Sequence, residues 1–117
     1  KIVGVKVDNI SFANNETALS AKAMAELDEL AKFMKAKPLS YAVVAGYTDN
    51  VGSRDDNDGL SRGRAEMVEA YPKAKHGIAD SRVVLFWYGP SNPIAPNDTP
   101  ENRGKNRRVE INVGLGE

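Results

Sequence analysis

Arg64 is the residue in this sequence whose position most clearly demands a chemical partner. At about 100° per residue, a helix beginning near Ser53 places Arg64 about 40° from Leu60, within an apolar stripe that includes Tyr71. Arg62 points away from that stripe. Because desolvating an unpaired guanidinium is costly, Arg64 needs an anionic partner. Two partners are open: an internal carboxylate in a buried ion pair, or an anionic ligand in a cleft.

The elements around Arg64 suggest where such a ligand would lie. The apolar run 40–47 is typical of a central strand buried on both faces. It is followed by the loop 48–53, and loops that leave buried strands commonly carry binding groups. Ser53 is the expected N-cap of the next helix, with Asp56 as its capping partner. We expect Pro72 to kink that helix or begin its breakdown, and Gly77 to end it.

The remaining segments complete an α+β fold. Ser20 should cap an earlier helix whose buried face repeats at helical spacing through Ala23, Leu27, Leu30 and Met34, and which Pro38 closes. The other predicted strands are 1–8, 82–88 and 108–113. The order is therefore βαβαββ, with a mixed four-stranded sheet and both helices on one face. We expect residues 89–100 to be irregular because they are rich in turn formers. Glu101–Arg108 should be a solvated basic loop.

Composition narrows the function classes. The chain has 117 residues, 16 basic and 16 acidic side chains, one histidine and no cysteine. Without cysteine there is no disulfide, thiol nucleophile or cysteine-based metal site, and the single His76 disfavours a histidine metal centre or triad. The balanced charge argues against a protein that coats nucleic acid. We expect no cofactor, no metal and no enzymatic activity, since no nucleophile–base pair accompanies Asp49 and Arg64.

Three groups of residues resemble the signature of one family, the OmpA-like C-terminal domains. Residues 46–65 match G-[HY]-T-D-x-x-G followed by N-x-x-L-S-x-x-R-A. Residues 91–94 and 106–110 are similar to the family's NP-[IV] turn and N-R-R-V-E strand start, and residues 12–15 to its F-x-x-N. The resemblance covers nearly the whole chain in the correct element order, and it implies an OmpA-like fold.

The resemblance also implies a ligand. Family members bind peptidoglycan noncovalently through the stem peptide, mainly its diaminopimelate, whose end group carries an ammonium and a carboxylate on one carbon. By position in the motifs, Asp49 would accept from the ammonium and Arg64 would fork onto the carboxylate. Asn57 would bond the ligand or brace the loop. The other matching positions are Arg107 as a further anion contact, Phe12 and Asn15 as a rim, and Thr48 and Leu60 through their backbone amides. Ala13 departs from the family's usual acid or amide.

The resemblance further suggests a setting for the domain. We expect residues 1–117 to form a single domain of a longer membrane-anchored protein. Its location would be the periplasm, tethered to the outer membrane or, second, to the inner membrane. A homodimer is left open. The alternative function is a periplasmic protein-interaction module in which Asp49 and Arg64 form only an internal ion pair. Trp87 and Tyr88 are expected in the core, with a rim or partner surface as the alternative.

Overall fold

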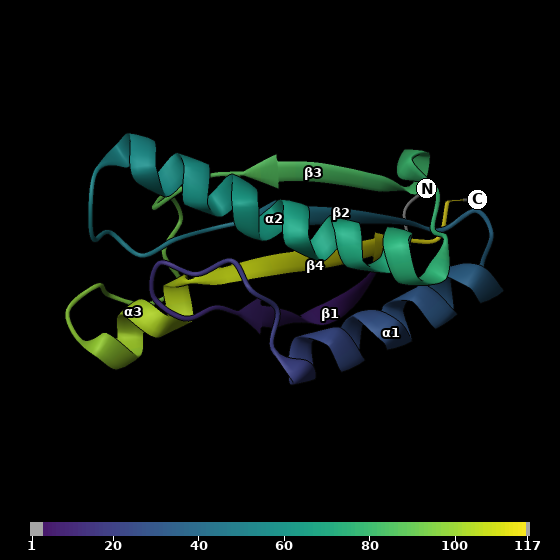
Figure 1. Ribbon diagram of the computed structural model, residues 1–117, viewed down its shortest axis with the longest axis horizontal. Coiled ribbons are helices and arrows are strands. Elements are labelled where there is room, and N and C mark those ends of the chain that lie inside the picture. Colours follow the sequence, from purple (N-terminus) through teal and green to yellow (C-terminus); the bar gives the residue numbers. More distant parts are fainter. Residues whose placement is uncertain (1–3, 117) are drawn as a thin grey trace.

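A single twisted sheet organises the protein, whose computed structural model describes residues 4–116 (Figure 1). The elements are β1 (Gly4–Ser11), α1 (Ala21–Ala36), β2 (Tyr41–Gly46), α2 (Arg54–His76), a short 3-10 helix (Asp80–Arg82), β3 (Val83–Trp87), α3 (Pro100–Asn106) and β4 (Arg108–Gly114). The strand order is β1-β4-β2-β3. β2 runs parallel to β3 and antiparallel to β4, which is antiparallel to β1. The predicted mixed four-stranded α+β fold is confirmed.

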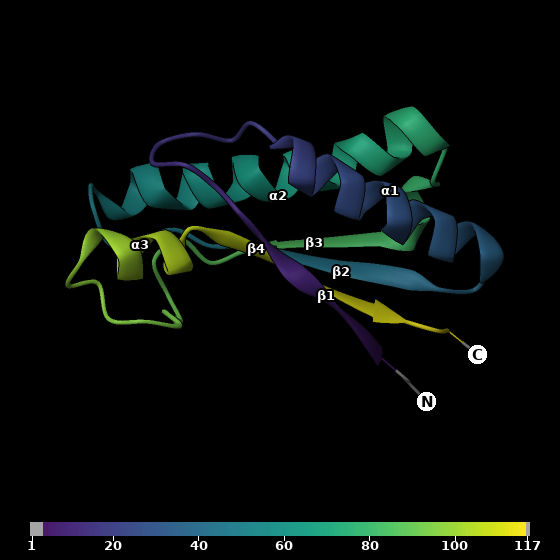
Figure 2. The same ribbon diagram turned by 90° about the horizontal axis from the view of Figure 1, so that it is seen from below.

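Both long helices lie on the same face of the sheet (Figure 2). The core fills the layer between them and the sheet. The side chains of Ala23, Leu27, Leu30 and Met34 on α1 and those of Val109, Ile111 and Val113 on β4 are all buried and belong to one core cluster. The helical spacing of one set and the alternation of the other predicted this arrangement. In the described part of the chain, no helix combines the length and the apolar character needed to cross a bilayer.

Local signals set the helix ends. The Ser20 and Ser53 hydroxyls accept hydrogen bonds from the amides of Ala23 and Asp56, at 3.0 and 3.1 Å, so both predicted N-caps are confirmed. Gly77 ends α2 in the left-handed conformation, with φ of 70°. The expected breakdown at Pro72 is wrong, because α2 continues to His76.

Two strands differ from the prediction. β2 is buried on one face only: Ala42 and Val44 are buried, whereas Tyr41 and Val43 are partly exposed, because both long helices among residues 4–116 lie on the same side of the sheet. β1 extends to Ser11 rather than ending at residue 8, and its pairing with β4 shifts register between Val7 and Ile10. Residues 1–3 of the predicted strand lie outside the described residues.

A third helix, α3, replaces much of the expected basic loop. The Thr99 hydroxyl caps it by accepting from the Asn102 amide at 3.0 Å, and Pro100 occupies its first turn, where a missing N–H costs nothing. The fully buried Asn106 ties the helix to the preceding turn. Its side chain accepts from the amides of Ile94 and Ala95 and donates to the Ala95 carbonyl, at 2.8 to 3.1 Å. α3 is therefore held firmly beside the strand ends.

The expectation that Trp87 and Tyr88 pack in the core is wrong. Their exposed fractions are 41% and 39%. The Tyr88 ring stacks between those of Tyr47 and Phe86, with centroids 5.4 and 6.2 Å away, and the Arg62 guanidinium lies 5.0 Å from the Trp87 ring. β3 is an edge strand, so Phe86, Trp87 and Tyr88 at its end remain partly exposed on the surface instead of entering the core.

Candidate functional site

The loop after β2, the start of α2, the loop after β1 and α3 meet at one end of the sheet, on the left in Figure 1. The predicted site residues belong to these segments or directly adjoin them. Gly46 of β2 pairs with Val109 at the start of β4, which brings the loop carrying Asp49 next to Arg107. The sheet therefore assembles residues that are far apart in the sequence.

Asp49 is held on both sides of its carboxylate. Oδ1 accepts from the Val51 amide at 3.0 Å, and Oδ2 accepts from Nη1 of Arg107 at 3.1 Å. The residue is only 4% exposed. Arg107 is fixed in turn, because its Nε donates to the Phe12 carbonyl at 3.1 Å. The carboxylate is thus oriented before any ligand arrives.

Arg64 is fully buried and does not pair with Asp49. Its Nε, Nη1 and Nη2 donate to the carbonyls of Glu16, Tyr47 and Ala13 at 2.9, 3.2 and 3.0 Å. Among the described residues, Asp49 forms its ion pair with Arg107 instead. The internal Asp49–Arg64 pair required by the interaction-module alternative is therefore not formed.

Burial also changes the acid–base behaviour of Arg64. Desolvation and the nearby positive charge of Arg107 lower the pKa of Arg64 to about 10, while the Asp49 carboxylate opposes that change. The guanidinium therefore stays charged at neutral pH. A guanidinium has five N–H groups, and with three donated to carbonyls, one remains on each terminal nitrogen. The predicted fork onto a ligand carboxylate stays a prediction.

Asn57 braces the loop above α2. Its amide donates to the Val51 carbonyl at 3.0 Å, and its side chain is buried. Gly52 follows with φ of 94°, a conformation that favours glycine. The two residues fold the loop back so that the Val51 amide can reach Asp49. Asn57 thus has the bracing role that was one of its two expected functions.

Two adjoining hollows cover Asp49. We call the first, of about 180 Å³, the Asp49 pocket. It is lined by Asn14, Asn15, Asp49, Val51, Gly52, Asp56, Asn57, Leu60 and Arg107. We call the second, of about 370 Å³, the α3 cleft. It is lined by Asn14, Asp49, Val51, Pro100, Arg103 and Arg107. Since four residues border both, the two form one continuous polar depression.

The structure separates the predicted residues into two groups. Five line the Asp49 pocket: Asn15, Asp49, Asn57, Leu60 and Arg107. Arg64, Phe12 and Thr48 are buried beneath it instead. The Phe12 ring centroid lies 5.3 Å from the Arg64 guanidinium, and the Thr48 hydroxyl donates to the Asp49 carbonyl at 2.8 Å. These three support the site from within.

Two charged residues that line the depression, Asp56 and Arg103, are not among the predicted ligand-binding residues. The sequence indicated only a helix-capping role for Asp56 and a basic loop for Arg103. A helix beginning at the Thr99-Pro100 pair would have placed Arg103 and Arg107 four residues apart on one side of a turn. That signal was available. The part of the chain that the structure describes contains no cluster of acidic or histidine side chains suited to a metal ion.

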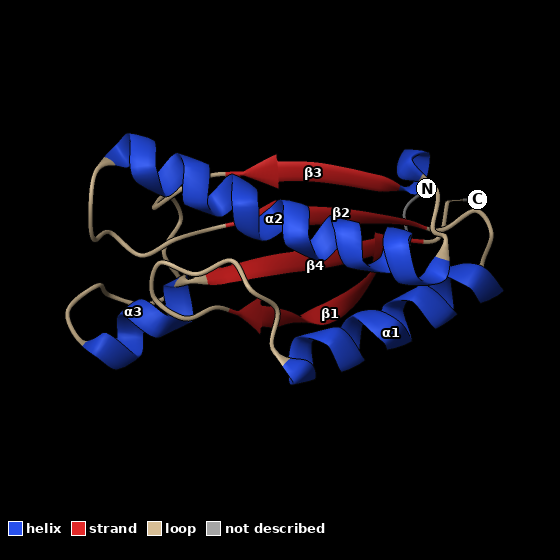
Figure 3. Cartoon of the chain, in the orientation of Figure 1, coloured by secondary structure: helices blue, strands red, loops and turns tan. Residues whose placement is uncertain are grey.

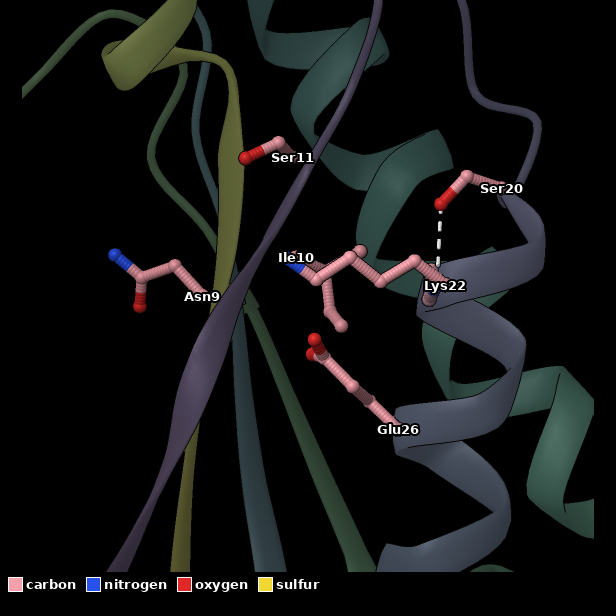
Figure 4. A pocket seen from close by; sticks show the side chains of 7 residues that line it. Asn9, Ile10, Ser11, Ser20, Lys22 and Glu26 are labelled. Carbon is pink, nitrogen blue, oxygen red and sulfur yellow. Dashed lines mark hydrogen bonds between the residues drawn. The ribbon is translucent and has the colours of Figure 1, made fainter.

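A smaller pocket, of about 80 Å³, lies between β1 and α1 (Figure 4). Glu26 extends from α1 towards β1, while Asn9 and Ser11 of the strand point away from the helix. None of the predicted ligand-binding residues lines it. Its size and position, apart from the residues around Asp49, distinguish it from the candidate site.

The sequence model of the OmpA family matches residues 11–107. This chain belongs to the OmpA family. Among curated relatives, the peptidoglycan-binding protein ArfA of Mycobacterium tuberculosis is 42% identical over 104 residues, covering 89% of this chain and 32% of the relative. Outer membrane porin F of Pseudomonas aeruginosa is 36% identical over 113 residues, covering 97% and 32%. The chain thus spans about a third of the length of these relatives.

Solved structures agree with this OmpA-family fold. The C-terminal domain of Helicobacter pylori MotB superimposes with a TM-score of 0.81 at 32% identity, covering 92% of this chain and 84% of that one. The peptidoglycan-associated lipoprotein of Burkholderia pseudomallei has a TM-score of 0.85, with 90% and 88% coverage. At 23% identity, the second likeness concerns the fold alone. The predicted OmpA-like fold is confirmed. Because domains of this family are structural binding modules, the expectation of a non-enzyme is confirmed as well.

Proposed function

We propose that this OmpA-family domain binds peptidoglycan noncovalently by holding the diaminopimelate end group of the stem peptide in the Asp49 pocket. The observation that carries the proposal is the pre-oriented, nearly buried Asp49 carboxylate with the Arg107 guanidinium 3.1 Å away. A carboxylate and a guanidinium side by side complement a ligand that carries an ammonium and a carboxylate on one carbon. The name of the 42% identical relative ArfA supports the ligand class.

The chemistry assigns each charge a partner. Each Asp49 oxygen accepts one bond from the protein and retains a lone pair, so the carboxylate can also accept from the ligand ammonium. Arg107 meets the ligand carboxylate through Nη2, which lies against Gly104, where a β-carbon would stand 3.3 Å away. Arg64, with one N–H left on each terminal nitrogen, adds a buried positive charge beneath the same group.

The remaining predicted residues shape the pocket. Asn15 and Leu60 form its walls, and Asn57 keeps the loop closed over α2. Phe12 and Thr48 act from below, through the Arg64 guanidinium and the Asp49 backbone. Since these supports are in place in the free protein, little ordering cost is left for binding.

We further propose that residues 1–117 are one module of a longer protein, which tethers a membrane to the cell wall from the periplasmic side. The support is the one-third coverage of relatives such as ArfA and outer membrane porin F. The membrane anchor would lie in a segment outside this chain. The name of outer membrane porin F favours the outer membrane, with the inner membrane second.

Asp49→Asn is expected to weaken binding to purified peptidoglycan sacculi by about tenfold or more, since a charge-assisted bond to an ammonium contributes about 1.5–3 kcal/mol. Co-sedimentation with sacculi measures the bound fraction. Asp55→Asn is the matched control: it removes one charge from an exposed residue in the first turn of α2 that does not line the pocket. Circular dichroism should show both variants folded.

Competition tests the end group itself. Free diaminopimelate should displace the domain from sacculi, whereas lysine with its α-amino and α-carboxyl groups blocked, which ends in an ammonium alone, should do so poorly. A wild-type domain that stays in the supernatant, or an Asp49→Asn variant that sediments like wild type, contradicts the proposal.

A further inference from the structure

The depression over Asp49 has ends of opposite charge. Asp56 lies at the Asp49 pocket end, and among the described residues its carboxylate has no cation within ion-pair distance. The neighbouring Arg54 pairs with Asp58 instead, at 3.4 Å. Arg103 lies at the α3 cleft end, and its guanidinium forms no ion pair with an acidic side chain within residues 4–116. Asp49 and Arg107 neutralise each other between them. A ligand lying along this depression therefore meets negative charge at one end and positive charge at the other.

Arg103 is placed to contact a group beyond the end group. It lies four residues before Arg107, the C-cap of α3, and its carbonyl accepts from the Arg107 amide at 3.2 Å, so the two residues are one turn apart. Both line the α3 cleft. When one carboxylate is held at Arg107, Arg103 remains available for a second carboxylate further along an extended ligand. The cleft, of about 370 Å³, has room for that extension.

We propose that Arg103 binds a second carboxylate of an acidic peptide, and so fixes the direction in which the stem peptide leaves the Asp49 pocket. This rests on the proposed function, which it deepens by adding a specificity-determining residue. The ammonium end lies towards Asp56, and the peptide runs over α3. The site then distinguishes stem peptides by the charge of the residue before diaminopimelate, and amidation of that carboxylate weakens binding.

The test uses two synthetic tripeptides, alanyl-γ-glutamyl-diaminopimelate and the same peptide with its glutamyl α-carboxylate amidated, both with the C-terminal carboxylate of the peptide backbone blocked as an amide. Isothermal titration calorimetry of the wild-type domain should show about fivefold tighter binding of the acidic peptide, the size expected for a partly exposed ion pair. The Arg103→Gln variant should bind both peptides equally. Lys105→Gln is the matched control, since Lys105 is an exposed cation on the same helix that lines neither hollow. It should keep the preference.

Diaminopimelate with the amino and carboxyl groups of its second end blocked separates the two proposals. Arg103→Gln should bind it as the wild type does, because it carries the end group and no second charged carboxylate. An Arg103→Gln variant that keeps the fivefold preference overturns the role of Arg103 while leaving the Asp49 pocket intact. A wild-type domain that binds neither peptide nor diaminopimelate overturns the proposed function, and this inference with it. Added salt should reduce the wild-type preference, since exposed pairs are screened.

Discussion

Arg64→Ala is expected to lower the free energy of unfolding by about 3–5 kcal/mol, the usual cost of breaking a buried charged network. Arg64 is fully buried and donates to the carbonyls of Ala13, Glu16 and Tyr47. Alanine would leave those three carbonyls without their donor and a cavity where the side chain was. Urea unfolding followed by circular dichroism measures the loss.

Arg62 supplies the control for that experiment. It lies on the same helix, and its side chain is 57% exposed. Arg62→Ala should lower the stability by no more than about 1 kcal/mol, because it loses only an exposed ion pair with Glu66 and a contact with the Trp87 ring. Arg64→Lys should fall between the two alanine variants, because it keeps the charge but loses the planar fork that reaches three carbonyls. Equal unfolding midpoints for Arg64→Ala and Arg62→Ala would show that the three bonds contribute little.

Gly46→Ala is expected to cost about 3 kcal/mol, at the upper end of overpacking effects. β2 and α2 approach so closely at Gly46 that an added β-carbon would overlap the Ser61 backbone carbonyl, and it would also crowd the Ala65 methyl at 3.3 Å. A backbone carbonyl in a helix cannot rotate away, so the helix itself would have to move. Because α2 carries Asn57 and Arg64, that movement would also disturb the site.

Gly59→Ala is the matched substitution for comparison. Gly59 is exposed within α2, and a β-carbon there would meet no atom within 4 Å. Alanine should raise the stability by about 0.5–1 kcal/mol, because glycine costs that much in a helix interior. Thermal unfolding of the two variants should therefore shift in opposite directions. A Gly46→Ala protein as stable as wild type would contradict the close approach.

Much of the fold was predictable because its elements carry local signals. The apolar spacing of α1 and the alternation in β4 each depend on neighbours within a few residues, and both predictions are confirmed. α3 was missed because it is short and polar, with Asn106 as its only buried residue. A short helix without an apolar face has no hydrophobic period, so only its Thr99-Pro100 start could have predicted it.

The candidate site shows a similar limit. The helical position of Arg64 correctly indicated a buried charge, but the internal carboxylate, one of its two expected partners, is wrong, because the guanidinium donates to three backbone carbonyls instead. Helical periodicity could not identify those acceptors, because Arg64 donates to backbone carbonyls, and every residue type has one. The pairing of Asp49 with Arg107 depends likewise on the sheet, which brings together residues 58 positions apart. Motif resemblance supplied the residues, and only the fold distinguishes those that line the pocket from those beneath it.

The position of the pocket relative to the chain ends has a mechanical consequence. At one end of the sheet, Gly114 of β4 pairs with both Gly4 and Tyr41, whereas Val109, at the other end, pairs with Gly46 beside the pocket. A pull between a bound ligand and the start of β1 therefore runs along the strands (Figure 1). Hydrogen bonds in antiparallel sheets lie perpendicular to the strands. Such a load shears many bonds together instead of unzipping them singly, a geometry suited to a module that resists tension.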